Sequence, residues 1–157
     1  MTSKDAHDHD QNFSVDEVLG LADKHCEDNS LKLTPARRKV MEILLSEGRA
    51  MGAYEILPFL DKAGFGGQPP VVYRALEFLQ KHGFVHKIER LNAFVACTHP
   101  GSDHSPAFMI CRDCSLVVET ESHPVAGMKS DAETKGFAID HTVVELEGVC
   151  ADCQPEK

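Results

Sequence analysis

The sequence predicts an α+β protein of two domains, because its 157 residues change character near residue 97. The first part contains stretches with helical periodicity or helix-capping residues, followed by two short runs of strand-forming residues. The second part combines strand-like runs with one helical stretch, and a Cys-x-x-Cys pair lies near each of its ends. These observations favour a winged helix-turn-helix domain followed by a small α+β domain with a four-cysteine metal site.

Three helices are expected before residue 65. The stretch "SVDE", residues 14–17, has the pattern of a capping box, with Ser14 as the cap and Glu17 three residues later. In "LTPARRKVMEILLSEG", Thr34 can cap a second helix, a proline follows at the first helical position, and Gly48 ends it. The stretch "AYEILPFLDKAG" predicts a third helix, in which Pro58 marks either a kink or a later start.

The fourth helix has the clearest pattern. The stretch "QPPVVYRALEFLQKHG" begins with two prolines, and its final glycine lies just past the helix end. Its apolar residues recur at i, i+3, i+4 and i+7 and form one face: Val72, Ala75, Leu76 and Leu79. Tyr73 and Arg74 lie off that face. The runs "FVHKIE" and "AFVAC", separated by "RLN", then predict a β-hairpin, the wing.

Turn-forming residues in "THPGSDHSP", residues 98–106, mark a hinge. Beyond it we expect strands in "AFMIC", "LVVET" and "FAIDHTVVELE", with a helix near residues 124–135 before the last of them. The expected divisions are a disordered acidic tail over residues 1–13, a winged-helix domain over 14–97, the hinge over 98–106, and the α+β domain over 107–157.

Charge is distributed unevenly along the chain, although the net charge is −9. Residues 1–30 hold two basic and eight acidic residues. Residues 31–90 hold ten basic and six acidic residues, and residues 91–157 hold four basic and eleven acidic residues. A basic segment between two acidic ones fits one domain that contacts a polyanion, although an excess of this size also arises by chance. No run approaches the roughly 18–20 apolar residues of a membrane span, and the polar N-terminus does not read as a signal peptide. We therefore expect a soluble, cytoplasmic protein.

The two cysteine pairs predict a shared zinc site. Without an export signal, cysteines are better interpreted as metal ligands or reduced thiols than as disulfides. Four thiolates suit a tetrahedral Zn²⁺ with bonds of about 2.3 Å, and such a closed site is structural rather than catalytic. The alternatives, a redox dithiol or an iron–sulfur cluster, lack a thioredoxin-like context and a ferredoxin-like run. The four expected ligands are Cys111, Cys114, Cys150 and Cys153.

A second group of possible ligands is more scattered. His86 lies in the first hairpin run, Cys97 ends the second, His104 lies in the hinge, and Glu119 ends the strand after the first cysteine pair. Spacing alone does not show that these four side chains meet, and each also fits an ordinary surface or core role. The remaining cysteine, Cys26, is interpreted as a buried residue of the first helix.

Several motifs together resemble the ferric uptake regulator family of metal-responsive repressors, and within it the branch of zinc uptake regulators. They are "LTPARRKVMEIL", "AYEIL", "PPVVYRALEFLQKHGFVHKIE", "FMICRDC" and "GVCADC", and the resemblance covers about residues 15–153. One departure is Val71, which stands where relatives commonly carry a threonine at the start of the recognition helix.

The resemblance implies two zinc ions per chain, the first held by the four paired cysteines. It implies a regulatory site formed by His86, Cys97, His104 and Glu119 at the junction of the two domains. A thiolate with imidazoles and a carboxylate suits Zn²⁺ better than harder ions. Some family members have a weaker third site, for which this chain offers three further histidines: His99, His123 and His141.

The resemblance also implies a DNA-binding homodimer that represses zinc-uptake genes, with zinc as co-repressor. The recognition helix would enter the major groove of double-stranded DNA, with Arg74 contacting a base and Tyr73 beside it. Tyr54 and Arg37 match family positions that contact the DNA backbone. The α+β domain would dimerise, and the operator would be an AT-rich inverted repeat.

Three other functions remain open at this point. A hydrolytic zinc enzyme is disfavoured because Cys97 would close the open coordination position and no HExxH motif is present; the zinc deaminase pattern is absent too. A zinc-buffering module would leave the basic helix without a role. An iron- or peroxide-responsive regulator of the same family is the nearest alternative. We expect a protein that is not an enzyme.

Overall fold

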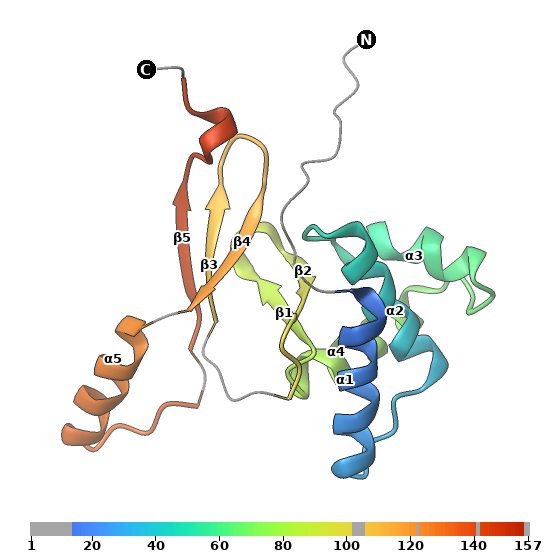
Figure 1. The fold of residues 1–157 in the computed structure, drawn as a ribbon, viewed down its shortest axis with the longest axis horizontal. Helices are drawn as coiled ribbons and strands as arrows, with labels where there is room; N and C mark the ends of the chain where they lie inside the picture. Colours follow the sequence, from blue (N-terminus) through green and yellow to red (C-terminus); the bar gives the residue numbers. More distant parts are fainter. Residues whose placement is uncertain (1–13, 102–105, 122, 141, 156–157) are drawn as a thin grey trace.

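The computed structural model describes residues 14–101, 106–121, 123–140 and 142–155 (Figure 1). Helices come first, then a hairpin, then a three-stranded sheet interrupted by one more helix. The elements are α1 (Val15–Asp28), α2 (Pro35–Glu47), α3 (Ala53–Lys62), α4 (Pro69–Lys81), β1 (Val85–Ile88), the 3-10 turn η1 (Glu89–Leu91), β2 (Ala93–Ala96), β3 (Pro106–Cys111), β4 (Val117–Glu121), α5 (His123–Thr134), β5 (Val144–Gly148) and the 3-10 turn η2 (Ala151–Cys153).

Local signals place the helix ends where the sequence predicts them. The Ser14 hydroxyl accepts from the Glu17 backbone N–H, and the Glu17 carboxylate accepts from the Ser14 N–H, which completes the capping box. Thr34 Oγ1 accepts from the backbone N–H of the third helical residue of α2, and Gly48, with φ of 59°, ends that helix in the left-handed region. Helix α3 continues through Pro58, so the predicted later start is wrong.

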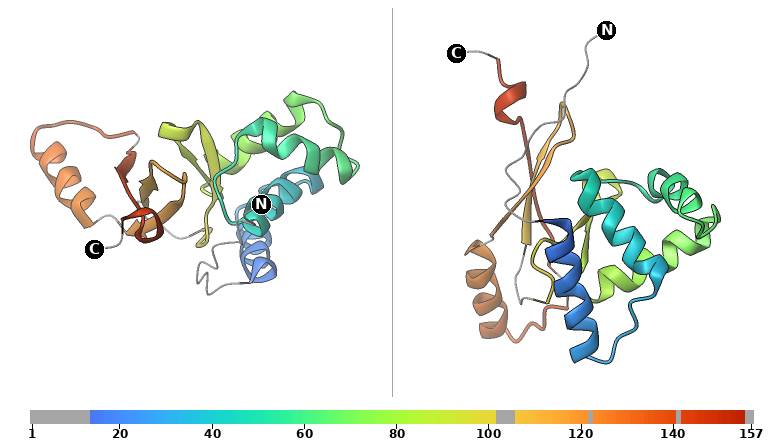
Figure 2. Two further views of the ribbon diagram at one scale, coloured as in Figure 1. Left: turned by 90° about the horizontal axis from the view of Figure 1, so that it is seen from above. Right: turned by 45° about the vertical axis from the view of Figure 1, so that its right-hand side comes forward.

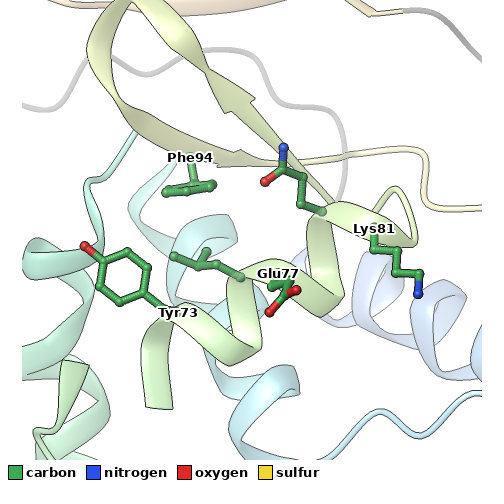
Figure 3. Close-up of a pocket in the computed structure, with 6 residues that line it drawn as sticks. Tyr73, Glu77, Lys81 and Phe94 are labelled. Carbon is green, nitrogen blue, oxygen red and sulfur yellow. The ribbon is translucent and has the colours of Figure 1, made fainter. Parts of the chain in front are cut away.

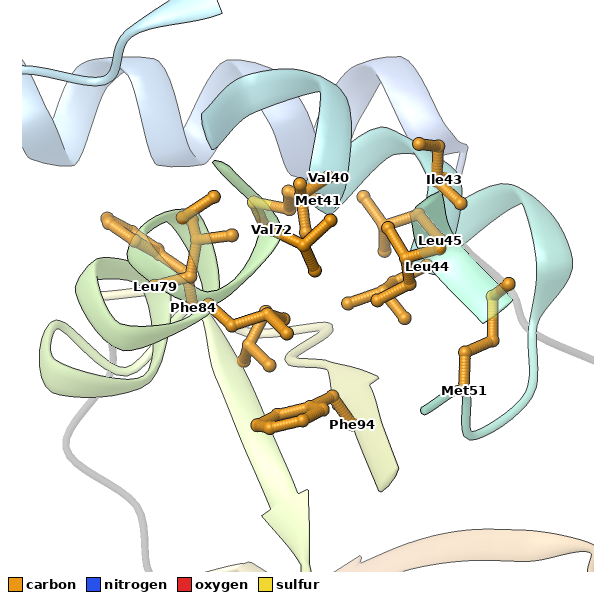
Figure 4. Close-up of a cluster of buried hydrophobic side chains, with 14 of the residues drawn as sticks. Val40, Met41, Ile43, Leu44, Leu45, Met51, Val72, Leu79, Phe84 and Phe94 are labelled. Carbon is orange, nitrogen blue, oxygen red and sulfur yellow. The ribbon is translucent and has the colours of Figure 1, made fainter. Parts of the chain in front are cut away.

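The hydrophobic core lies among the four N-terminal helices and includes the hairpin (Figure 4). The predicted apolar face of α4 is buried against α2. Phe84, just before β1, and Phe94, in β2, belong to the same core. Because each large apolar side chain contributes about 1.5–3 kcal/mol when it is fully buried, this packing fixes both α4 and the wing. The outward face of α4 therefore has a defined orientation.

The three-stranded sheet has the order β4-β3-β5, with β3 antiparallel to β4 and parallel to β5. Alternation along the strands separates two faces. Phe108 pairs with Glu119 on one side and Glu145 on the other, so these three share a face; Met109 pairs with Val118 and Leu146 on the opposite face.

The last strand is shorter than the run "FAIDHTVVELE" predicts, because only Val144–Gly148 is extended in the sheet. Its ladder with β3 begins at the pair Ala107↔Val144, and β3 itself begins at Pro106. A proline has no N–H to extend the ladder, and among the described residues β5 has no partner on β3 before Val144.

The hairpin lies between the helices and the three-stranded sheet, and α5 lies on the far side of the sheet (Figure 2). Ile88 of β1 is fully buried and packs in a small cluster with Phe108 and Ile110 of β3. The opposite face of the sheet leaves Met109, Val118 and Leu146 exposed by 44%, 37% and 54%. Within the part of the chain that the structure describes, no helix is both long and apolar enough to cross a membrane.

Candidate metal centres and DNA-facing helix

The parallel pairing of β3 and β5 brings the two cysteine pairs together. Cys111 is the last residue of β3, and its partner in the register is Gly148, the last residue of β5. Cys150 follows Gly148 after one intervening residue, so the long spacer is taken up by β4, α5 and the connection that returns to β5. The first pair turns back through Ser115, which has a positive φ of 62° and donates its backbone N–H to the Cys111 carbonyl.

The four sulfur atoms have the spacing of a tetrahedral metal site. All four lie within 4.8 Å of one another, and the sulfurs of Cys114 and Cys150 are 3.7 Å apart. Two ligands on a tetrahedron with bonds of about 2.3 Å are about 3.8 Å apart, whereas a disulfide requires about 2.05 Å. The Cys150 backbone N–H also donates to Cys111 Sγ at 3.4 Å. The described geometry therefore fits one zinc ion held by four sulfurs.

Acid–base properties of the cluster agree with a cation site. The backbone N–H groups of Cys150 and Cys114 stabilise the thiolate of Cys111 and lower its pKa to about 6. The neighbouring thiols of Cys150 and Cys114 raise the pKa of Cys153 to about 12. One thiolate, that of Cys111, is thus available at neutral pH to bind a metal, while the thiol of Cys153 needs the positive charge of the ion before it loses its proton.

The second cluster joins the hairpin to the sheet. One ligand atom from each of His86, Cys97 and Glu119 lies within 4.8 Å of the other two. His86 comes from β1, Cys97 follows β2, and Glu119 comes from β4 on the sheet face that also carries Phe108. The Cys97 backbone N–H donates to the carbonyl of residue 84 at 2.8 Å, and the His86 ring lies 5.6 Å from the ring of Phe108.

This cluster suits zinc by its donor types. Cys97 is fully buried, and burial raises the pKa of its thiol to about 12. The thiol therefore keeps its proton until a cation replaces it. An imidazole, a thiolate and a carboxylate together fit Zn²⁺ better than a harder ion. The fourth predicted ligand, His104, lies outside the described residues.

The outward face of α4 carries the residues predicted to meet DNA. Tyr73 and Arg74 are exposed, and Arg74 makes no hydrogen bond or ion pair with any described residue. Figure 3 shows Tyr73, Glu77 and Lys81 on α4 and Phe94 on the hairpin, which line an open groove between the two elements. Val71, the departure at the start of α4, packs partly buried against the helical core.

Two further predicted contacts differ in their surroundings. Tyr54, the second residue of α3, is 71% exposed. The Arg37 guanidinium instead stacks on the ring of Phe78 at 3.8 Å from its centre and donates to the Lys32 carbonyl at 2.6 Å. Arg37 thus ties the start of α2 to α4.

The remaining predicted residues are placed as follows. Cys26 is buried in α1, as expected. His99 is exposed, and its Nδ1 lies 3.0 Å from the Thr98 hydroxyl. The other two histidines of the proposed third site, His123 by its side chain and His141 entirely, lie outside the described residues. Sequence reasoning missed Glu145, whose carboxylate contacts the hairpin; the alternation in "VELEG" was the only available signal.

The fold joins an exposed recognition helix to a metal-ligating cluster that spans two domains. Such a combination defines a DNA-binding regulator that responds to a metal.

The sequence matches the ferric uptake regulator family over residues 28–147, and the chain belongs to that family. Its members are transcription regulators, which confirms the prediction that the protein is not an enzyme. The chain is 38% identical over 142 residues to the zinc uptake regulation protein of Escherichia coli K12, which covers 89% of this chain and 83% of the relative.

Solved structures agree with this relationship. The chain is similar to a zinc uptake regulator complexed with zinc and DNA, with a TM-score of 0.83, 38% identity, and coverage of 90% of this chain and 95% of that one. The comparison with the crystal structure of holo XcZur has a TM-score of 0.79 at 38% identity and covers 89% of this chain and 98% of that one. The comparison with the crystal structure of apo XcZur has a TM-score of 0.52 at 37% identity and covers 88% of this chain and 97% of that one.

Proposed function

We propose that this protein is a zinc-sensing, sequence-specific repressor of zinc-uptake genes in the cytoplasm, with zinc as the co-repressor. The observation that carries the proposal is the convergence of His86, Cys97 and Glu119 where the hairpin meets the sheet. Support also comes from the 38% identity to a zinc uptake regulation protein and from the likeness to a regulator bound to zinc and DNA.

The two clusters have different roles in this proposal. Cys111, Cys114, Cys150 and Cys153 hold a structural zinc ion, because four sulfurs close the coordination shell. His86, Cys97 and Glu119, with His104 as the fourth ligand, hold the regulatory ion. A weaker third site would use His99, His123 and His141.

DNA binding is assigned to the first domain, residues 14–97. Helix α4 enters the major groove, where the exposed Arg74 contacts a base and Tyr73 lies beside it. Tyr54 and Arg37 contact the backbone of the duplex. Residues 98–106 are assigned to the hinge and residues 107–157 to the dimerisation domain, and the acidic tail predicted over residues 1–13 lies outside the described residues.

Dimerisation is assigned to the outer face of the sheet, where Met109, Val118 and Leu146 lie side by side and exposed. A row of apolar side chains of this kind is stabilised by burial against another surface. Two copies related by a twofold axis would present two α4 helices, so the operator is an AT-rich inverted repeat.

Zinc sensing follows from where the ligands lie. A bound ion supplies a set of bonds with fixed directions. His86 and Cys97 belong to the hairpin and Glu119 to the sheet, so ligation favours one arrangement of the two domains and hence one separation of the recognition helices. Zinc and operator then strengthen each other's binding by the same factor. At nearly equal identity, the chain superposes better on holo than on apo XcZur, which supports two distinct arrangements among relatives.

The test measures zinc per chain and operator affinity in the same preparations. We expect about two zinc ions per chain, one of which leaves on mild chelation while the dimer stays folded and operator affinity falls. Cys97→Ala should lose that ion and the zinc response. Cys26→Ala, a buried cysteine outside both clusters, is the matched control and should keep both.

Two results would overturn the proposal. A Cys97→Ala variant that still binds its operator in a zinc-dependent manner would remove the sensing role from this cluster. Restoration of operator binding by iron(II), and not by zinc, would assign the protein to the iron-responsive alternative.

A further inference from the structure

A carboxylate on β5 contacts the tip of the hairpin. Glu145 Oε1 accepts from the backbone N–H of Glu89 at 2.6 Å, and Glu145 Oε2 accepts from the backbone N–H of Arg90 at 3.0 Å. Next to this contact, Glu147 accepts from the Arg90 guanidinium. These contacts join residues 55–57 positions apart in the chain, across the junction of the two domains.

The contact satisfies backbone groups that the hairpin cannot satisfy itself. Glu89 and Arg90 are the first two residues of η1, and the first N–H groups of any helical turn lack partners within it. The preceding residue, Ile88, offers no side-chain oxygen, and no side chain of the turn caps it. Glu145 therefore acts as a cap provided by the other domain, with both oxygens used. Hydrogen bonds to an ionised carboxylate are stronger than neutral ones.

Glu145 and the regulatory ligand Glu119 lie on opposite edges of the sheet. The strand order is β4-β3-β5, with Glu119 on β4 and Glu145 on β5, and both residues pair with Phe108. They consequently share the face that meets the hairpin. Between them, Ile88 packs on Phe108 and Ile110.

The hairpin is thus attached to the sheet along a line of three contacts: the metal ligands at one edge, an apolar contact in the middle and the carboxylate at the other edge. An apolar contact is non-directional and permits rocking. With directional contacts at both edges, the hairpin cannot tilt about the middle one. Removal of the carboxylate would leave only the metal edge to resist tilting.

Resting on the proposed function, we infer that Glu145 is a positioning residue for zinc-dependent DNA binding. It holds the wing against the sheet in the arrangement that the regulatory site also requires. Its two hydrogen bonds exist only when the hairpin lies on the sheet, so they shift the population toward that arrangement. Part of the free energy that sets the spacing of the two recognition helices therefore comes from the hydrogen bonds of Glu145, which involve no metal ion.

Glu147 provides a matched control on the same strand. Its ion pair with Arg90 joins two exposed side chains, 58% and 42% accessible, and exposed pairs contribute little. Glu147→Gln should therefore leave operator binding within about twofold of wild type. Glu145→Ala removes both acceptors, whereas Glu145→Gln keeps one and should give an intermediate effect.

The experiment compares wild type, Glu145→Ala, Glu145→Gln and Glu147→Gln as zinc-loaded dimers. The probe is a duplex selected by the wild-type protein from a random-sequence pool in the presence of zinc. We expect Glu145→Ala to bind it about 5- to 30-fold more weakly, with zinc content and dimer unchanged, and Glu145→Gln to lie between. Hydrogen exchange should accelerate at the amides of residues 89 and 90 and stay unchanged at the amide of Cys97, whose partner is the carbonyl of residue 84.

Operator affinity unchanged in Glu145→Ala, or lowered equally in Glu147→Gln, would overturn the inference. Loss of the dimer in both Glu145 variants would also overturn it, because the residue would then be structural. Failure of the proposed function is recognised separately, since wild type would then select no duplex in a zinc-dependent manner. In that case the hydrogen-exchange rates of the amides of residues 89 and 90 still decide whether Glu145 holds the hairpin on the sheet.

Discussion

Among the glycines, Gly101, in the segment that follows β2, is the position where an added methyl group would meet the shortest contact. Its φ is +83°, and a Cβ there would lie 2.7 Å from Nδ1 of His25 in α1. A left-handed conformation costs a residue with a Cβ about 1–2 kcal/mol. The His25 ring packs edge-on against the buried Phe84 at 5.5 Å, so it yields to the new atom only by disturbing that contact.

Together the two effects should lower the stability of Gly101→Ala by about 2–3 kcal/mol, or about 5–10 °C in Tm for a chain of this size. Thermal unfolding followed by circular dichroism measures the shift. Gly136→Ala is the matched control, because Gly136 also has a positive φ, +68°, but no atom lies within 4 Å of its added Cβ. The Tm of Gly136→Ala should fall only by the amount that the left-handed backbone conformation costs.

The double variant His25→Ala/Gly101→Ala separates the two effects. Removal of the ring gives the new methyl group space, so the steric share of the destabilisation should disappear relative to His25→Ala. Equal Tm losses for Gly101→Ala and Gly136→Ala, or no relief in the double variant, would refute the reasoning.

Three further predictions concern the metal, the DNA and the pH. Cys114→Ala should lose the structural zinc and yield an unfolded or monomeric chain by light scattering; a stable dimer would contradict a structural site. Arg74→Ala should lose about 1–3 kcal/mol of discrimination at one base position of the selected duplex; an equal loss on all sequences would indicate a phosphate contact. The Gly52 backbone N–H and the Arg49 guanidinium lower the pKa of Glu55, so its stabilisation is present at neutral pH and lost as the pH falls below the ordinary glutamate range. Glu55→Gln should therefore reduce the acid-induced fall in Tm, and an unchanged fall would show that the cap does not contribute.

The features that the sequence predicted best are those decided within one turn of a helix. Ser14, Thr34 and Gly48 end or begin helices through contacts with residues three or four positions away, so the pattern contains the whole interaction. The four-cysteine site was also predictable, because each pair already fixes two ligands of one ion.

The features that could not be predicted from the sequence depend on contacts between elements that are distant in the chain. The length of β5 depends on where Pro106 lets the neighbouring strand begin, which no periodicity in residues 137–147 reveals. Glu145 was missed because its partners are backbone N–H groups, which look alike at every residue. The meeting of His86, Cys97 and Glu119 was implied only by family resemblance, since it requires the hairpin to pack on one chosen face of the sheet.

The parallel pairing of β3 and β5 also bears on the order of assembly. The core of the helices and the hairpin is built from buried apolar side chains alone, whereas the sulfurs of Cys114 and Cys150 meet across 36 positions of chain. Closing so long a loop costs entropy before any contact repays it, and such topologies form slowly. A newly made chain should therefore complete its recognition helix before it completes its cysteine site. Under zinc starvation the chain would accumulate as a partly folded species, in which the recognition helix is folded and the four-cysteine site is not.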